Sequence, residues 1–419
     1  MANDRFEELI PRPPRGLRIS SLVLGAILLL ILGFGAGVAT MLFAGADLQR
    51  AVSTLAPGAP AVAAPPEEGF KLLDEVWTIL QEEYVDPEAL DNQELIHGAA
   101  SGMAGAVGDP HTVFVEPLPA AIMEQDMQGS FEGIGASVDM IDGRIVIVHP
   151  LPNSPALAVG LQEGDVILAA DGESLEGKTL TEAITLIRGS QGTVVHLLIE
   201  REGVAEPFVV SVTRDKIELM TVEYTMRDDG IAYVRLTEFN AIARDRLREA
   251  LEELMRQDPK GLILDLRSNP GGYLDMAVDV AGEFLPRGTL VLTESERDRE
   301  PKEHRVRGRG LATEIPLVVL VNRGSASASE IVAGAIRDHD RGVLIGETTY
   351  GKGSVQNPHR LTDGSSLRVT IARWYLPNGD HLDGNGIVPD IEVTPSPEES
   401  LAGADPQLDR AVAFLINGE

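Results

Sequence analysis

Three segments rich in glycine and serine carry residue types that can perform acyl transfer. They read RSNPGG at 267–272, NRGSASASE at 322–330 and YGKGSVQ at 350–356. A serine at the start of a helix lies near unpaired backbone N–H groups and the positive end of the helix dipole. Those donors can stabilise an oxyanion, and the glycines at 271 and 272 let backbone approach closely from the other side. The serines at the head of the predicted helix 327–337 are therefore candidate nucleophiles.

A serine nucleophile needs a base, and Lys352 is the candidate because no histidine lies nearby in the sequence. An ordinary lysine with a pKa of about 10.4 is neutral in about one molecule in 2,500 at pH 7. Removal from water that lowered the pKa to about 8 would raise that fraction to about one in ten, at a cost of roughly 3.3 kcal/mol. The flanking glycines allow Lys352 to enter a tight pocket, and Gln356 can orient the amine without adding charge. Plain turn and packing roles for these segments are the alternative.

The three segments follow predicted strands in a region that alternates strand with helix. Strands are expected at 231–236, 262–266, 317–321 and 343–345, with helices at 243–257, 274–284 and 327–337 between them. This order is typical of an α/β domain with a largely parallel sheet, whose ligands bind at the carboxyl ends of the strands. A further strand is expected at 366–375, and a last short helix follows residue 399.

The chain before this region has a different pattern. Residues 129–214 contain short strands broken by glycine and proline, such as 144–148 and 194–200, and one amphipathic helix at 180–187. Helices expected at 70–84 and 93–107 would form a small packing or dimerisation element. The chain is therefore expected to contain several domains.

An apolar segment near the N-terminus predicts a membrane helix. Residues 19–45 carry no charged side chain and would extend about 40 Å as a helix, enough to cross a hydrocarbon core of about 30 Å. Four arginines precede the segment and one follows it closely, which predicts a cytoplasmic N-terminus and export of the rest. We therefore expect an uncleaved single-pass anchor and an Ala- and Pro-rich tether that ends at residue 66. A cleaved signal peptide is the alternative.

Composition and motifs exclude several functions. The net charge is −30, from 35 basic and 65 acidic residues, so nucleic acid is not an expected partner. The absence of cysteine removes disulfides, thiolate metal sites and thiol nucleophiles. The P-loop-like run at 346–353 has Gly353 where Ser or Thr would hold magnesium, and no histidine pattern indicates a metal site. No metal or cofactor is expected.

Further motifs occur in order along the chain. They are EEYVD at 82–86, GDPHT at 108–112, GSFEGIGA at 129–136, SPALAVGLQEGDVILAADG at 154–172 and GIVPDIEV at 386–393. Together with the three segments above, they resemble the carboxyl-terminal processing peptidases, or tail-specific proteases, from about residue 70 to 393.

The resemblance implies an endopeptidase with a crotonase-like α/β core and a Ser/Lys dyad. It identifies Ser327 with the nucleophile, Lys352 with the general base and Gln356 with the residue that orients the lysine. It also implies an oxyanion hole in the backbone of three residues: Gly271, Gly272 and Ala328. Ser325 and Ser329 are expected to pack or cap the start of the helix.

The resemblance further identifies residues 129–214 with a PDZ domain. Its carboxylate-binding loop would consist of Gly133, Ile134, Gly135 and Ala136. A bare C-terminus would add to this domain as an edge strand, while its last apolar side chain fills a pocket near the helix 180–187. Two departures from the family pattern, His111 and the charged insert 294–309, lie outside the catalytic positions.

These observations predict a membrane-anchored, extracytoplasmic serine endopeptidase of a bacterial cell membrane. Its substrates would be proteins or peptides with apolar, unstructured C-termini, and a homodimer or a regulatory partner protein is compatible with the sequence. The expected parts are a cytoplasmic N-terminus (1–18), a transmembrane anchor (19–45), a linker (46–67), a helical region (68–128), a PDZ domain (129–214), a peptidase core (215–396) and a tail (397–419). The alternative is a PDZ tail-binding adaptor with an inactive core, against which the intact Ser327, Lys352 and Gln356 argue.

Overall fold

The computed structural model describes residues 67–396, 398–399 and 403–418. The described residues fall into two units, which meet between residues 87 and 88 of the chain. In the first unit, helix α2 (Glu67–Glu83) carries exposed apolar side chains such as Val76 and Ile79. The predicted anchor and the tether to residue 66 lie outside the described residues. Within the part of the chain that the structure describes, no helix is long and apolar enough to span a membrane.

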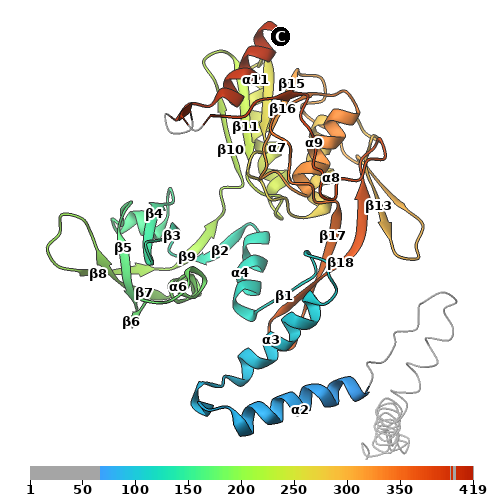
Figure 1. The fold of residues 1–419 in the computed structure, drawn as a ribbon. Helices are drawn as coiled ribbons and strands as arrows, with labels where there is room; N and C mark the ends of the chain where they lie inside the picture. The colour runs from blue at the N-terminus through green and yellow to red at the C-terminus, as the bar shows by residue number, and fades with distance from the viewer. Residues whose placement is uncertain (1–66, 397, 400–402, 419) are drawn as a thin grey trace, which may run out of the picture. The chain divides into compact units, whose positions relative to one another are not determined.

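A mostly parallel sheet forms the centre of the second unit, as the sequence predicts (Figure 1). Its strands follow the order β10 (Val222–Met226), β11 (Ile231–Leu236), β12 (Gly261–Asp265), β15 (Leu317–Val321), β16 (Val343–Gly346) and β19 (Ile391–Glu392). β10 is antiparallel to β11, and the other neighbours are parallel. Every residue of β12 and β15 is buried, because their nearly unbroken apolar runs suit a sheet covered on both faces.

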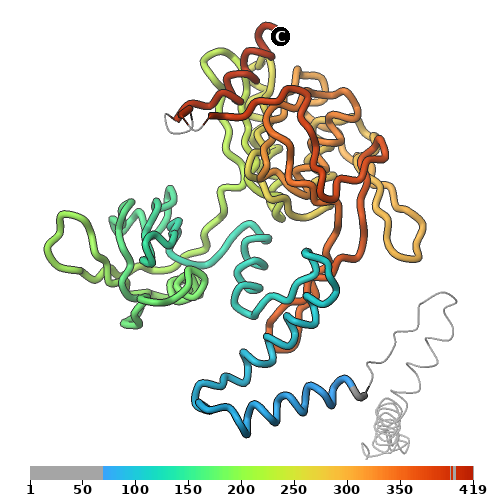
Figure 2. The backbone as a smooth tube through the Cα atoms, in the orientation of Figure 1, coloured from blue at the N-terminus to red at the C-terminus, as the bar shows by residue number. Residues whose placement is uncertain are grey.

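Helices cover both faces of this sheet. The helices α7 (Ala243–Met255), α8 (Leu274–Phe284) and α9 (Ala328–Asp338) bury their apolar stripes on one face. On the other face, Ile263 and Val318 pack in one cluster with Ala411 of α11 (Pro406–Asn417). Figure 2 shows this C-terminal segment returning to the strands of the sheet, although it is the last part of the chain.

The sequence predicts only one strand of a second, antiparallel sheet. The expected strand β18 (Ser366–Tyr375) pairs with β17 (Ser354–Arg360), β1 (Val113–Val115) and β13 (Leu290–Glu296), and β13 pairs with β14 (Lys302–Arg305). The charged insert at 294–309 thus contributes to the hairpin of β13 and β14. In β17 the proline at 358 and the polar residues around it hide the alternation that would reveal a strand. The β17–β18 hairpin begins two residues after Lys352.

Two further groups of elements precede the central sheet. The helices α3 (Asn92–Gly105) and α4 (Pro117–Met127) flank β1, and η1 (Pro87–Ala89) is a short turn. An antiparallel sheet then follows the order β3 (Ala136–Ile141), β4 (Arg144–Pro150), β5 (Val166–Ala170), β7 (Val194–Glu200) and β8 (Phe208–Thr213), and β6 (Glu173–Ser174) pairs with β5. This region also holds α5 (Pro155–Ala158) and α6 (Leu180–Ile187). The chain enters it through β2 (Ser130–Gly133) and leaves through β9 (Asp215–Glu218), which pair with each other.

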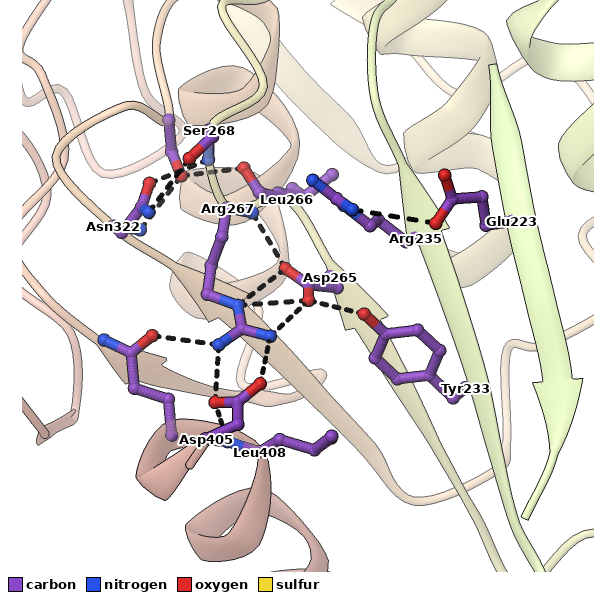
Figure 3. A network of polar contacts seen from close by, with 12 residues as sticks. Glu223, Tyr233, Arg235, Asp265, Leu266, Arg267, Ser268, Asn322, Asp405 and Leu408 are labelled. Atoms are coloured by element: carbon purple, nitrogen blue, oxygen red, sulfur yellow. Dashed lines mark hydrogen bonds and ion pairs between the residues drawn. The ribbon is translucent and has the colours of Figure 1, made fainter. Parts of the chain in front are cut away.

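The C-terminal helix is tied to the end of β12 by Arg267 (Figure 3). The Arg267 guanidinium donates to Asp405 at 2.7 and 2.8 Å and to Asp265 at 2.6 Å. Tyr233 donates to Asp265 at 2.7 Å, and Gln407 accepts a bond from Arg267. Burial alone would raise the pKa of Asp405, but hydrogen bonds from Arg267 and from backbone N–H groups hold it below its usual value.

Replacing Asp405 by alanine should lower the free energy of unfolding by about 2 kcal/mol, because it leaves Arg267 donors and the first turn of α11 without their acceptor. The stabilisation exists above the unfolded-state pKa of about 3.9 and disappears as the pH falls through the lowered folded-state pKa. Urea unfolding at pH 7 and at a strongly acidic pH, below the folded-state pKa of Asp405, measures both effects. Asp409→Ala, an exposed change on the same helix, is the control. Equal midpoints for Asp405→Ala and the parent would contradict this account.

Candidate active site

The loops that follow β12 and β15 are joined by buried polar side chains. The Ser325 hydroxyl donates to the carbonyl of Leu266 at 2.8 Å, and the Ser329 hydroxyl donates to the carbonyl of Asn269 at 2.9 Å. Asn269 donates in turn to the carbonyl of Leu236, and all three of these polar side chains belong to buried residues. Ser325 and Ser329 therefore have the packing role expected of them. They hold the start of α9 against the glycine loop after β12.

Ser327 immediately precedes α9 in a backbone conformation that serine rarely adopts. Its φ is 54° and its ψ is −112°. Such conformations cost about 1–3 kcal/mol and persist only where the surroundings fix them. Here the Ser327 N–H donates to a carboxylate oxygen of Glu330 at 2.8 Å, within the first turn of the helix that follows. Ser327 itself is half-buried, so its side chain is not sealed from solvent.

The three residues expected to form an oxyanion hole differ in their surroundings: Gly271 packs closely against the serine loop, whereas Gly272 and Ala328 have backbone N–H groups without an acceptor among the described residues. A side chain at Gly271, whose φ is 101°, would meet Ser327 Cβ at 2.8 Å and the Ala328 nitrogen at 2.9 Å, so the position requires glycine. The Gly271 N–H is already bonded to the Asn269 side chain at 2.9 Å. The N–H groups of Gly272 and Ala328, by contrast, remain without a partner in the part of the chain that the structure describes.

A buried carboxylate connects the serine loop to the lysine loop. Glu330 is fully buried, and its two oxygens accept from the backbone N–H groups of Ser327 at 2.8 Å, Gly351 at 2.7 Å and Lys352 at 2.9 Å, and from the Thr349 hydroxyl at 2.5 Å. Burial raises the pKa of Glu330, although these donors oppose the shift. One oxygen serves both Ser327 and Lys352, so their backbone nitrogens lie within about 6 Å of each other.

Lys352 is half-buried, and its pKa is lowered from the usual value for lysine. Burial is the largest cause, and the positive charge of Arg368 adds to it. The carboxylates of Glu330 and Asp109 act in the opposite direction. The direction of the net shift is the one that a lysine acting as a base requires.

The glycines on either side of Lys352 fit against a neighbouring segment. A side chain at Gly351 would meet the Gly386 nitrogen at 2.6 Å, and one at Gly353 would meet the His381 ring at 2.6 Å. Because β17 follows directly, the helix that a P-loop requires after its lysine is missing here. Gly353 therefore serves close packing beside Lys352.

Gln356 lies on β17 and is bonded within the hairpin. Its side-chain nitrogen donates to the hydroxyls of Ser354 at 2.9 Å and Thr370 at 3.1 Å. Among the described residues, no hydrogen bond joins Gln356 to Lys352. The two hydroxyls thus hold the amide through its nitrogen, and its carbonyl oxygen accepts no hydrogen bond from the described residues.

The loop expected to bind a carboxylate connects β2 to β3. Gly135 has a φ of 72°, and a side chain there would meet Ser154 Cβ at 2.5 Å. Beside the loop lies a cavity of about 330 Å³, whose lining includes Ile134, Ala136 and, from α6, Ile184 and Ile187. Strand β3 is the edge of its sheet. An edge strand beside an apolar pocket can accept an extended peptide.

Sequence reasoning missed Glu330 and Asp109. The signal for Glu330 was its position three residues after Ser327, a spacing typical of a helix N-terminus, which suggests a local role only. Asp109 lies in the GDPHT motif and accepts from Thr112 at 2.6 Å, while Thr112 accepts from the Thr370 N–H at 3.1 Å. Its proximity to Lys352 depends on contacts between distant segments, for which the sequence carries no signal.

The charged run at 337–341 has structural partners. Arg337 pairs with Asp338, and His339 contacts the carbonyl of Leu290 at 2.7 Å. Over the described ranges, no group of three or more His, Asp or Glu side chains is arranged to hold a metal ion.

Comparisons with known proteins match two regions of the chain to known families. Residues 230–393 match the family model of peptidase family S41, and residues 123–200 match that of the PDZ domain. The chain is 39% identical to a carboxy-terminal-processing protease of Bartonella bacilliformis over 75% of this chain and 73% of the relative. It is 36% identical to a carboxyl-terminal-processing protease of Synechocystis over 82% of each chain. The structure of a putative S41 protease from Bacteroides fragilis, 18% identical, covers 86% of this chain and 100% of that chain with a TM-score of 0.51, which indicates a shared fold.

The matched ranges include the segments described above. The S41 range contains the loops after β12, β15 and β16, and the PDZ range contains α6 and the loop between β2 and β3. The chain therefore belongs to peptidase family S41, among the carboxy-terminal processing proteases, and is a serine-type peptidase that carries a PDZ domain.

Proposed function

We propose that this peptidase is an endopeptidase in which Ser327 is the nucleophile and Lys352 is the general base. The observation that carries the proposal is the Glu330 carboxylate, to which the backbone N–H groups of both residues donate. The lowered pKa of Lys352, caused first by burial, supports the base role because it increases the neutral fraction of the amine. The strained backbone of Ser327 supports the nucleophile role, since strain of this kind is concentrated at functional positions.

The proposed reaction proceeds through an acyl-enzyme. The Ser327 hydroxyl attacks the carbonyl carbon of the scissile peptide while Lys352 Nζ takes its proton. The N–H groups of Gly272 and Ala328 donate to the oxyanion that forms. Lys352 then gives the proton to the departing amine, which leaves the first product and an ester on Ser327. Water, deprotonated by the same lysine, hydrolyses the ester and releases the second product.

Gln356 acts in this proposal as a positioning residue. Its amide nitrogen is occupied by the hydroxyls of Ser354 and Thr370, so its carbonyl oxygen is available to the Lys352 amine. A neutral acceptor orients the amine without the strong preference for the charged form that a carboxylate would impose.

The PDZ domain supplies a second proposal, that substrates are recognised by apolar, unstructured C-terminal tails. A tail that adds beside the edge strand β3 satisfies backbone groups that the sheet leaves unpaired. Its last apolar side chain would then enter the cavity beside Ile134 and Ile184. The loop between β2 and β3 would hold the terminal carboxylate.

We further propose that the enzyme is anchored in a cell membrane with its catalytic domain outside the cytoplasm. The support comes from the uncharged segment 19–45 and from the arginines that precede it. Substrates would then be proteins that reach the outer side of this membrane.

Ser327→Ala and Lys352→Arg should each reduce peptide-bond cleavage about 10³-fold, because the first removes the nucleophile and an arginine does not accept the proton. The full chain in detergent is incubated, with a chelator and without ATP, with an unstructured reporter that ends in an apolar tail. Mass spectrometry of the products measures turnover and identifies the cleaved bond. Retained cleavage in either variant would overturn the dyad. Tail binding without cleavage by the parent chain would favour the inactive adaptor.

Glu330→Gln should lower kcat about 10²-fold with little change in KM, because a displacement of about 1 Å between catalytic groups has an effect of this size. An amide offers one acceptor oxygen where the carboxylate offers two, so two of the four donors lose their partner. The matched control is Glu347→Gln, whose carboxylate pairs with the exposed Arg323. A kcat equal to that of the control would show that the carboxylate does not position the dyad.

Ile184→Asp should weaken binding of an apolar C-terminal peptide at least about tenfold, because it puts an unpaired charge on the wall of the pocket. Thr185→Asp adds the same charge to the exposed side of α6 and should leave the affinity unchanged. Fluorescence anisotropy of a labelled peptide, with Ser327→Ala in both proteins to prevent cleavage, measures the dissociation constants. Equal affinities would argue against tail capture in this cavity.

A further inference from the structure

A cavity of about 850 Å³ lies between α3, the segment around β1 and the hairpin of β17 and β18 (Figure 1). Its lining is mostly apolar and includes Met103 from α3, Phe114 from β1, and Leu367 and Val369 from β18. Ligand pockets of proteins commonly enclose roughly 300–1,000 Å³ and combine an apolar wall with a few polar groups. The cavity therefore has the size and the lining of a binding site, and no role proposed above occupies it.

One end of the cavity is shared with the groups that hold Gln356. Ser354 and Thr370 belong to its lining, and their hydroxyls are the acceptors of the Gln356 side-chain nitrogen, at 2.9 and 3.1 Å. Thr112, which also belongs to the lining, accepts from the Thr370 N–H at 3.1 Å. The residues that orient the Gln356 amide are thus wall residues of the cavity.

A carboxylate of the lining connects this end of the cavity to the loop of Lys352. Asp383 accepts from the Gly353 N–H at 3.0 Å, and Gly353 directly follows Lys352 in the chain. The next residue after Asp383, Gly384, donates to the carbonyl of Gly351 at 2.9 Å. Residues on both sides of Lys352 are therefore bonded to a segment that lines the cavity, which places this end of the cavity beside the lysine loop.

The cavity extends along the hairpin away from Lys352. Ser354 and its partner Arg373 line it near the lysine loop, and Leu367, the partner of His359, lines it farther along. From Ser354 to His359, β17 advances by five residues, which is about 16 Å at about 3.3 Å per residue. The cavity thus follows the hairpin over a length that matches about five residues of an extended peptide.

The proposed reaction brings the substrate to the end of the cavity at the lysine loop. Lys352 gives its proton to the departing amine, so the cleaved bond lies within hydrogen-bond reach of Nζ. An unstructured substrate is extended on both sides of this bond, and its neighbouring residues pass the walls around the lysine loop. An apolar side chain that enters the cavity leaves water, which favours binding.

We propose that this cavity is a substrate subsite, which binds an apolar segment of the polypeptide close to the scissile bond. The enzyme then selects the bond that it cleaves as well as the tail that it captures. The inference rests on the proposed roles of Ser327 and Lys352. The occupant is the substrate rather than a helix of a second copy of this chain, because a permanently seated helix would cover the end of the cavity at the lysine loop.

Two reporters test the preference of the proposed subsite. Both are unstructured and end in the same apolar tail, and they differ in one internal run, where serine alternates with leucine in one reporter and with alanine in the other. The full chain in detergent should cleave the leucine reporter with a kcat/KM at least about tenfold higher, because the larger side chains fill the cavity better. Equal kcat/KM values, measured by mass spectrometry of the products, would overturn the proposal.

Ala100→Phe should remove this preference, because Ala100 lines the cavity and a phenyl ring in its place fills part of the volume. The kcat/KM for the leucine reporter should fall about tenfold, and that for the alanine reporter should stay near the parent value. The matched control is Ser101→Phe, the same new side chain at the next residue of α3, which is exposed and outside the lining. Equal effects of the two variants on the leucine reporter would contradict the subsite.

Photo-crosslinking locates the bound side chain without relying on cleavage. The full chain with Ser327→Ala is irradiated with the leucine reporter, in which photo-leucine replaces each leucine in turn. Mass spectrometry should find crosslinks to Met103 or Val369, and Ala100→Phe should remove them while Ser101→Phe does not. The absence of crosslinks to the lining would overturn the subsite. If the lining is crosslinked but the chain with Ser327→Ala still cleaves the reporter, the dyad is wrong and the subsite stands, so the two proposals fail separately.

Discussion

The Glu330 carboxylate lies fully buried at the start of α9, and each of its oxygens accepts two hydrogen bonds. A carboxylate removed from water is strongly destabilising unless its lone pairs are satisfied. Three of the four hydrogen-bond donors to the Glu330 carboxylate belong to the loop after β16. The lone pairs of the carboxylate are therefore satisfied only when this loop lies against the start of α9. The same requirement that makes the buried group tolerable therefore fixes the distance between the backbones of Ser327 and Lys352.

The surrounding architecture makes this junction possible because two sheets contribute to it. Parallel strands β12, β15 and β16 end at one edge of the central sheet and deliver the glycine loop, the serine and the lysine. The antiparallel hairpin of β17 and β18 then adds Gln356 and Arg368 from a second sheet. Lys352 lies in the short link between β16 and β17, where flanking glycines allow the close approach of residues 381–386.

The sequence predicted those parts that depend on local periodicity. The bounds of α6, α8, β11, β15 and β18 agree with the structure residue for residue, because each is a clear amphipathic or apolar run between turn residues. The grouping of Ser327, Lys352 and Gln356 near strand ends followed from the order of strands and helices. Two members of the site were beyond that reasoning: Asp109 and Arg368 influence Lys352 through packing between segments that are far apart in the chain. β17 was also missed, since Pro358 interrupts its pattern.

The fixed C-terminal helix has a consequence for an enzyme with a PDZ domain. Residues 406–417 are helical, and Asp405 at the head of this helix is bound by Arg267. Near the other end, the Leu415 side chain packs closely against Gly261 at the start of β12. An edge strand accepts only an extended peptide, so a helical segment docked in this way is a poor ligand for β3. The fold thus keeps residues 406–417 out of the extended conformation that an edge strand such as β3 requires of a peptide.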